Sequence, residues 1–127
     1  MKAGAVGVTV SDIDTFAIAA AEFNAEVNQV HLTSCAENVL DTQPSDRWQT
    51  ILAGDIFYER DTAARAFAFL ANHARPGATI LIGDPERTFL PKAKLVRLAD
   101  YRVPVTRDLE DAEIKQTAVW TISPDDL

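Results

Sequence analysis

The stretch Ile51–Glu59 reads ILAGDIFYE, an apolar run that stops at an aspartate and continues into a tyrosine and a glutamate. A short run that is apolar at nearly every position is typical of a strand buried on both faces, as in a parallel sheet covered by helices. Parallel sheets carry their chemistry at the carboxyl ends of their strands. The stretch therefore predicts an α/β fold with Asp55 at the edge where ligands bind.

Two further segments repeat this pattern. A predicted strand at Val6–Ser11 ends in Asp12, and the apolar run 78–83 ends in Asp84. Asp14 is a plausible N-cap for a helix that ends near Asn28. One face of that helix carries only apolar side chains: Phe16, Ala19, Ala20, Phe23 and Val27. Alternation of strands and helices on this scale predicts βαβ units and a largely parallel sheet.

Local signals place the remaining elements. A second helix is expected to begin at Asp61-Thr62 and to end at Arg75-Pro76-Gly77. Its apolar stripe consists of Ala63, Phe67, Leu70 and Ala74. Residues 30–33 suggest a short strand, residues 38–47 a loop, and Thr50–Gly54 a strand.

The C-terminal third has a different character. Pro91 can open a short helix through Leu95 and Leu98. Pro104 confines the segment Tyr101–Arg107 to an edge strand or excludes it from the sheet. The apolar residues of the last segment alternate with polar ones, as in a half-covered strand: Ile114, Ala118, Trp120 and Ile122. We predict a hairpin that adds antiparallel pairing to the sheet.

Bulk properties limit the function classes. The 127 residues correspond to one domain, 1–127, of ordinary globular composition. A net charge of −7 opposes binding to nucleic acid. Neither a membrane-spanning stretch nor a signal-peptide profile is present, and the single Cys35 suits a reducing compartment and is most simply a small buried hydrophobe. We therefore expect a cytoplasmic protein without membrane or nucleic-acid partners.

The acids at the strand ends are the candidate functional residues. Asp12 is placed either to accept hydrogen bonds from ribose hydroxyls or merely to cap the following turn. Asp55, Tyr58 and Glu59 have a spacing that turns them toward one pocket, but Asp55 and Glu59 could instead cap the helix near Asp61. His31 and His73 lack partners at metal-ligand spacing, so no metal site is expected.

Three segments together resemble class I S-adenosylmethionine-dependent methyltransferases. They are residues 8–14 with the following alanine-rich helix, residues 52–59, and residues 81–85 followed by Arg87, Leu90 and Pro91. Within that class they are most similar to the bacterial relatives of the lysine methyltransferase acting on electron transfer flavoprotein β-subunit, a group close to ribosomal-protein methyltransferases. The resemblance implies a Rossmann-like sheet, an S-adenosylmethionine cofactor, and a protein substrate of one of these two kinds.

The resemblance also implies residue roles. Asp12 would hold the cofactor ribose, Ile13 would lie against the adenine, and Asn38 could accept a hydrogen bond from the adenine amino group. Asp55, Tyr58 and Glu59 would form the methyl-transfer pocket, where Asp55 would also bind the cofactor. Asp55 or Glu59 would orient the amine, and Tyr58 would supply an aromatic wall or a hydroxyl.

One family feature has no counterpart here. Members of the family begin with a strand, a glycine-rich loop that approaches the cofactor, and a helix, whereas residues 1–5 resemble only the end of that helix. The first strand lies between the strands that correspond to those ending at Asp12 and Asp55. We therefore expect two strand edges without a common neighbour, and poor cofactor binding by these 127 residues alone.

Two other hypotheses compete with this interpretation. The chain could be a noncatalytic remnant that serves as an interaction or oligomerisation module through its open strand edges. It could also be a nicotinamide-dinucleotide domain, since Asp12 would suit that ribose equally well. The latter needs the same glycine loop and leaves Tyr58 and Glu59 without a role, so it ranks last.

Overall fold

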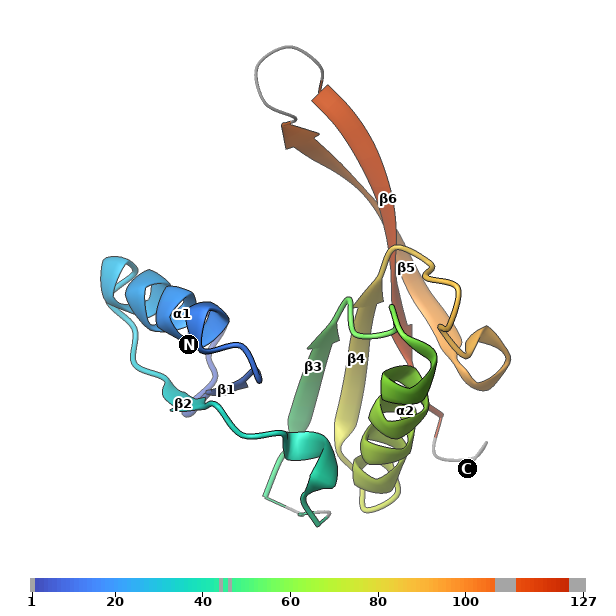
Figure 1. Cartoon of the computed structure of the whole chain (residues 1–127), viewed down its shortest axis with the longest axis horizontal. Helices are drawn as coiled ribbons and strands as arrows, with labels where there is room; N and C mark the ends of the chain where they lie inside the picture. The colour runs from blue at the N-terminus through green and yellow to red at the C-terminus, as the bar shows by residue number, and fades with distance from the viewer. Residues whose placement is uncertain (1, 44, 46, 107–111, 124–127) are drawn as a thin grey trace. The chain divides into compact units, whose positions relative to one another are not determined.

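The computed structural model describes residues 2–43, 45, 47–106 and 112–123. The chain divides into two compact units, Met1–Thr42 and Gln43–Leu127. We describe each unit by itself. Figure 1 shows the elements of both.

The first unit is a small βαβ motif. It contains β1 (Thr9–Ser11), α1 (Thr15–Val27), β2 (Thr33–Cys35) and the 3₁₀ helix η1 (Val39–Asp41). β1 and β2 pair in parallel, with Thr9 opposite Thr33. The predicted cap of α1 is confirmed, because the Phe16 amide donates to Asp14 Oδ1 at 2.8 Å.

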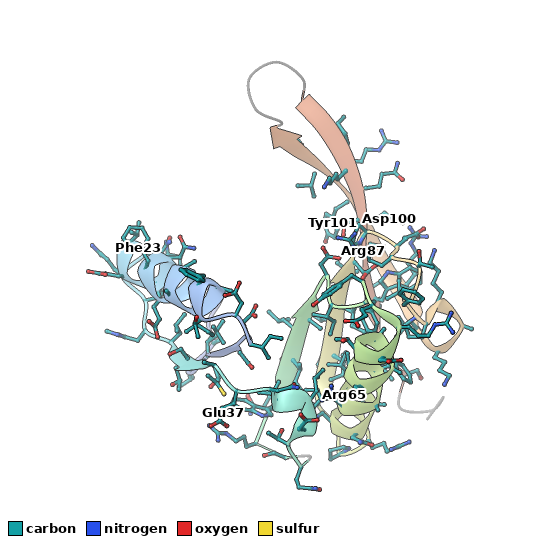
Figure 2. The ribbon with its side chains drawn as sticks, viewed as in Figure 1. Phe23, Glu37, Arg65, Arg87, Asp100 and Tyr101 are labelled. Carbon is teal, nitrogen blue, oxygen red and sulfur yellow. The ribbon has the colours of Figure 1, made fainter. Side chains whose placement is uncertain are left out.

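Two strand boundaries predicted for this unit were wrong. The first strand begins at Thr9 rather than at Val6, and the second begins at Thr33 rather than at residue 30. The turn after α1 runs through Gln29 with φ +55, which delays the return of the chain to the sheet. The apolar face of α1 is exposed at Phe16 (84%), Phe23 and Val27, whereas Ile18 and Ala25 are buried. Phe23 is labelled on α1 in Figure 2.

The second unit is a four-stranded mixed sheet with one helix. Its strands are β3 (Thr50–Gly54), β4 (Thr79–Asp84), β5 (Val96–Thr106) and β6 (Ala112–Thr121), in the order β3-β4-β6-β5. β3 and β4 are parallel, while β6 runs antiparallel to both of its neighbours. The predicted parallel pair and C-terminal hairpin are thus confirmed (Figure 1).

The core of the second unit lies between α2 (Arg60–Ala74) and the sheet. The inward residues of β4, Ile80 and Ile82, are buried, as are Ala63 and Leu70 of α2. This confirms the predicted stripe of α2, with Phe67 half-buried beside it. His73 is also buried; Nδ1 donates to the Phe69 carbonyl at 2.8 Å and Nε2 accepts from the Ser45 amide at 3.3 Å. Its role is structural.

Two boundaries differ from expectation in this unit. α2 begins at Arg60 with Glu59 at the N-cap position, rather than at Asp61-Thr62. The helix expected from Pro91 is only the 3₁₀ turn η2 (Lys92–Lys94), and Leu98 belongs to β5, because pairing with β6 begins at Val96. β5 is an edge strand, as Pro104 predicts. Arg107 lies outside the described residues.

The strands that precede Asp12 and Asp55 belong to different sheets. Among the described strands, β1 pairs only with β2, and β3 pairs only with β4. This agrees with the expectation that these two strands lack a common neighbour. None of the helices in the described ranges combines the length and apolarity that a bilayer-spanning segment needs.

Candidate functional site

Asp55 follows β3 in a conformation that few residue types adopt. Its φ is +52°, in the left-handed region that aspartate and asparagine tolerate better than most side chains. Its amide donates to the Gly83 carbonyl of β4 at 2.9 Å. This hydrogen bond links the backbone at the carboxyl end of β3 to the neighbouring strand and fixes the position of the Asp55 backbone, from which its side chain extends.

The Asp55 carboxylate accepts hydrogen bonds from two nitrogens of one guanidinium. Arg87 Nε donates to Oδ1 at 2.6 Å and Arg87 Nη2 donates to Oδ2 at 2.7 Å. This hydrogen bonding, together with the positive charge of Arg87, holds the pKa of the Asp55 carboxyl below its ordinary value of 3.8. The carboxylate is ionised at neutral pH and already has a cationic partner.

A buried carboxylate sets the position of Arg87. Asp84, the last residue of β4, is fully buried, and its Oδ1 accepts from the Arg87 amide at 2.6 Å. Within the described ranges its Oδ2 has no hydrogen-bond partner. Burial raises the pKa of the Asp84 carboxyl above 3.8, and the Arg87 amide opposes that shift in part. The intervening Glu86 has φ +66 and completes the turn.

Tyr58 and Glu59 follow Asp55 in the same loop. Tyr58 is 60% exposed, while Phe57 before it is completely buried and anchors the loop in the core. Glu59 Oε2 accepts from the Thr62 hydroxyl at 3.1 Å, and its carbonyl accepts from the Ala63 amide at 2.8 Å. Glu59 thus takes part in the start of α2, although its side chain makes no capping bond to a backbone amide.

Of the four residues predicted to bind the cofactor, Asp55 belongs to the second unit and the other three lie in the first. Asp12 follows β1, and its Oδ1 accepts from the Asp14 amide at 2.9 Å. Ile13 beside it is 70% exposed. Asn38 follows β2 and caps η1, with its Oδ1 accepting from the Leu40 amide at 3.2 Å. Because β1 and β2 are parallel, Asp12 and Asn38 both follow carboxyl ends of the same two-stranded sheet.

A cavity of about 470 Å³ lies elsewhere in the first unit. It is lined by residues of α1 and of the segment before β2: Glu22, Ala25, Glu26, Gln29, Val30, His31 and Leu32. Asp12, Ile13 and Asn38 are not among these residues. In the described part of the chain, no three His, Cys, Asp or Glu side chains group in a way that would hold a metal ion.

No role was predicted from the sequence for Asp84 and Arg87, the two residues that hold the Asp55 side chain in place. Both belong to one of the segments that resemble methyltransferases, but neither was a candidate site residue. The available signal was Asp84 at the end of a second buried strand, which the parallel pairing places beside the strand of Asp55. The Arg87–Asp55 pair joins positions 32 residues apart, and nothing in either local segment predicts it.

Sequence comparison finds relatives of one kind. The electron transfer flavoprotein beta subunit lysine methyltransferase of Danio rerio is 31% identical over 122 residues, covering 92% of this chain and 47% of the relative. That of Mus musculus is 30% identical over 127 residues, covering 95% and 49%. The chain therefore spans about half the length of the curated relatives it matches. No protein-family model matches the chain.

Structure comparison finds methyltransferases as well. The N-methyltransferase NodS from Bradyrhizobium japonicum WM9, solved in complex with S-adenosyl-L-homocysteine, superposes with a TM-score of 0.62 at 15% identity. The match covers 91% of this chain and 66% of NodS. By sequence, the chain is therefore a relative of the electron transfer flavoprotein beta subunit lysine methyltransferases, and its fold is that of the S-adenosylmethionine-dependent methyltransferases.

Proposed function

We propose that this chain belongs to a protein-lysine N-methyltransferase that uses S-adenosylmethionine, and that residues 1–127 are part of one methyltransferase domain. The observation that carries the proposal is the match to lysine methyltransferases along 92–95% of the chain. The acids at the carboxyl ends of β1 and β3 support it, because ligands bind at these ends in open α/β sheets.

The residues of the first unit fit the nucleoside half of the cofactor. Asp12 uses Oδ1 for the Asp14 amide, and an ionised carboxylate retains acceptor capacity for two ribose hydroxyls. The exposed Ile13 offers an apolar surface for the adenine ring. Asn38 Oδ1 accepts from Leu40 and has a second lone pair for the adenine amino group.

Residues of the second unit are assigned to methyl transfer. S-adenosylmethionine supplies a methyl group to which the lysine nitrogen lone pair bonds, while the C–S electron pair leaves on sulfur and the amine proton goes to solvent. The chain must present a deprotonated amine about 3 Å from the reacting carbon and exclude water. Asp55 is the group that orients the amine, exposed Tyr58 forms the pocket wall, and Glu59 borders it from the start of α2.

The substrate is proposed to be a protein of the electron transfer flavoprotein β-subunit kind, with a ribosomal protein as the other candidate. The names of the relatives favour the first. A net charge of −7 favours a protein over a nucleic acid as the partner, and the lone Cys35 favours the cytoplasm as the compartment.

Cofactor binding can be tested with a matched pair of variants. Asp12→Asn and Asp14→Asn both keep an oxygen for their local backbone hydrogen bond, and each removes one charge. Calorimetry with S-adenosylmethionine should show binding weakened about tenfold or more by Asp12→Asn, because charged hydrogen bonds to the ribose are lost, and little change for Asp14→Asn. Equal losses of affinity in the two variants would contradict the assignment of Asp12 to the cofactor site. The 127 residues alone are expected to bind weakly, and the chain with its flanking coding sequence tightly.

Activity can be tested on both substrate candidates. The chain with its flanking coding sequence is incubated with S-adenosylmethionine and either electron transfer flavoprotein or ribosomal protein, and lysine methylation is located by peptide mass spectrometry. We expect methyl groups on lysines of the first protein, and their loss in Asp55→Ala. Methylation of neither protein would count against the proposed function.

The open strand edges support a second candidate function, an interaction or oligomerisation module. The outer edge of β3 carries neither charge, proline nor bulge, and natural edge strands usually have one of these protections. Strand addition by a partner or a second copy would satisfy its backbone groups. Light scattering after size exclusion would show a dimer or larger species in that case, whereas a clean monomer would favour the enzyme.

A further inference from the structure

The Asp55–Arg87 ion pair stands where the proposed function needs a lysine to bind. The two side chains are 50% and 46% exposed, so a third group can approach the pair from solvent. Both Asp55 oxygens are engaged by Arg87, at 2.6 and 2.7 Å. A substrate amine that reaches Asp55 therefore meets a guanidinium there as well.

Arg87 is held at Asp55 from two directions. Its amide is bonded by the buried Asp84 carboxylate at 2.6 Å, which closes the turn after β4. The nearby Glu86 does not compete for the guanidinium, because it pairs with Lys92 and Arg97 at 3.0 Å each. The arginine is thus directed to Asp55 by its backbone as well as by its charge.

The charge state of a lysine decides whether it can be methylated. The free amine has a pKa of about 10.4, and only the neutral form has the lone pair that attacks carbon. A lone carboxylate beside it would favour the ammonium and raise that pKa. A carboxylate already paired with a guanidinium attracts the ammonium much less, because the two fields oppose each other. The same oxygens still accept a hydrogen bond from a neutral amine.

We propose that Arg87 is a positioning residue that neutralises Asp55, so that the substrate lysine is held at the site as a neutral amine. This inference rests on the proposed function. Asp55 accepts an N–H from the amine and takes no proton. The amine has lost its proton to solvent beforehand, the nitrogen lone pair forms the N–C bond, and the C–S electron pair departs with sulfur.

Other charged groups around Asp55 act in the same or the opposite direction. Lys115 of β6 adds positive potential at Asp55, and the buried Asp84 of β4 adds negative potential when it is ionised. Glu59 and Arg60 at the start of α2 carry opposite charges. Arg87 is the one for which the structure gives direct hydrogen bonds to Asp55, so its removal should produce the largest change.

The test is the pH dependence of kcat/KM for lysine methylation by the chain with its flanking coding sequence. In the Arg87→Gln variant, kcat/KM should be about tenfold or more below wild type near neutral pH. The difference should shrink as the pH rises, because the pKa of the bound lysine amine is expected to be higher in the variant by about one pH unit. Arg87→Lys keeps the positive charge but loses the bidentate hydrogen bonding, so its kcat/KM should lie between those of wild type and Arg87→Gln. Arg97→Gln, which removes a cation bonded to Glu86 and Asp100 rather than to Asp55, should keep the wild-type profile.

A second readout does not depend on turnover. A substrate peptide with a ¹³C-methyl label on its lysine nitrogen, bound in the presence of S-adenosylhomocysteine, reports the pKa of that amine by NMR. The value should be higher in the Arg87→Gln complex than in the wild-type complex. An unchanged amine pKa, or a slower Arg87→Gln enzyme with the wild-type pH profile, would overturn the inference. A wild-type protein that methylates no lysine at any pH would refute the proposed function, and the inference with it.

Discussion

The two units carry the same local pattern, a strand followed by an acid, but they fix the acid by different means. After β1, the Asp12 carboxylate accepts from an amide only two residues away. After β3, the Asp55 carboxylate is held by a side chain 32 residues away, which is itself positioned by a buried acid. The comparison shows that one pattern in the sequence can lead to a locally held group or to one held by tertiary structure.

The two units also differ in the apolar side chains that they bury. Within the described ranges, the buried apolar residues of the first unit are Ile18 and Ala25. The second unit buries a set of large side chains that includes Phe57, Leu70 and Ile82. Since burial of apolar surface is the main stabilising contribution to folding, the second unit should hold most of the stability of the described chain.

The largest expected effect compares two identical substitutions. Phe57→Ala removes a ring that is 0% exposed and should lower the free energy of unfolding by about 3–5 kcal/mol. Phe16→Ala removes a ring that is 84% exposed and should change it by about 0.5 kcal/mol or less. Urea denaturation measures both. A comparable loss for Phe16→Ala would show that the apolar face of α1 is covered in solution, and the contrast between the units would fail.

Hydrogen exchange should reveal the same contrast without a mutation. The β1–β2 ladder pairs three residues of each strand, whereas β3 and β4 pair over five positions and lie against a core. We expect amides of β2 to exchange with opening free energies at least about 2 kcal/mol below those of β4. Equal protection in both sheets would indicate that the chain opens as one cooperative unit.

Features with a local cause were predictable from the sequence. The strand Thr50–Gly54 was predicted with the bounds that it has, because its centre is apolar and polar residues border it. The cap at Asp14 and the end of α2 near Gly77, which has φ +110, also depend on neighbouring residues alone. The edge position of β5 follows from Pro104, whose nitrogen has no hydrogen to donate.

Features that depend on distant contacts were not predictable. Periodicity shows which face of α1 is apolar but not what covers it, and Phe16 and Phe23 proved to be exposed. The partner of Asp55 depends on the turn Asp84–Arg87 and on the parallel pairing that brings it beside β3. The roles predicted for Asp12, Ile13, Asn38, Asp55, Tyr58 and Glu59 remain predictions until they are tested by mutation.

A smaller effect is expected from the acid that supports Arg87. Burial raises the pKa of Asp84 above 3.8, so the folded protein binds this proton more tightly than the unfolded chain does. Its contribution to stability is complete below 3.8 and is lost as the pH rises through the raised pKa. Asp84→Asn does not titrate. As the pH rises above 3.8, the free energy of unfolding of the wild type should therefore fall relative to that of the variant.

The control for this experiment is Ile82→Val, which alters the same strand without removing a titrating group. Its difference from wild type should stay constant over the same pH range. A constant difference for Asp84→Asn as well would mean that water reaches Asp84 in solution, and that Arg87 is not positioned by a buried carboxylate.

The smallest expected effect concerns the ion pair itself. A double-mutant cycle with Asp55→Asn and Arg87→Gln should give a small favourable coupling free energy at neutral pH, since the pair is bidentate but half-exposed. The pKa of Asp55 is lowered, so this contribution is present above 3.8 and is lost as the pH falls through the lowered pKa. Added salt should reduce the coupling as well. A coupling of zero at neutral pH would mean that the turn at Asp84, rather than attraction to Asp55, directs Arg87; the two strand-end acids would then differ in geometry but not in energy.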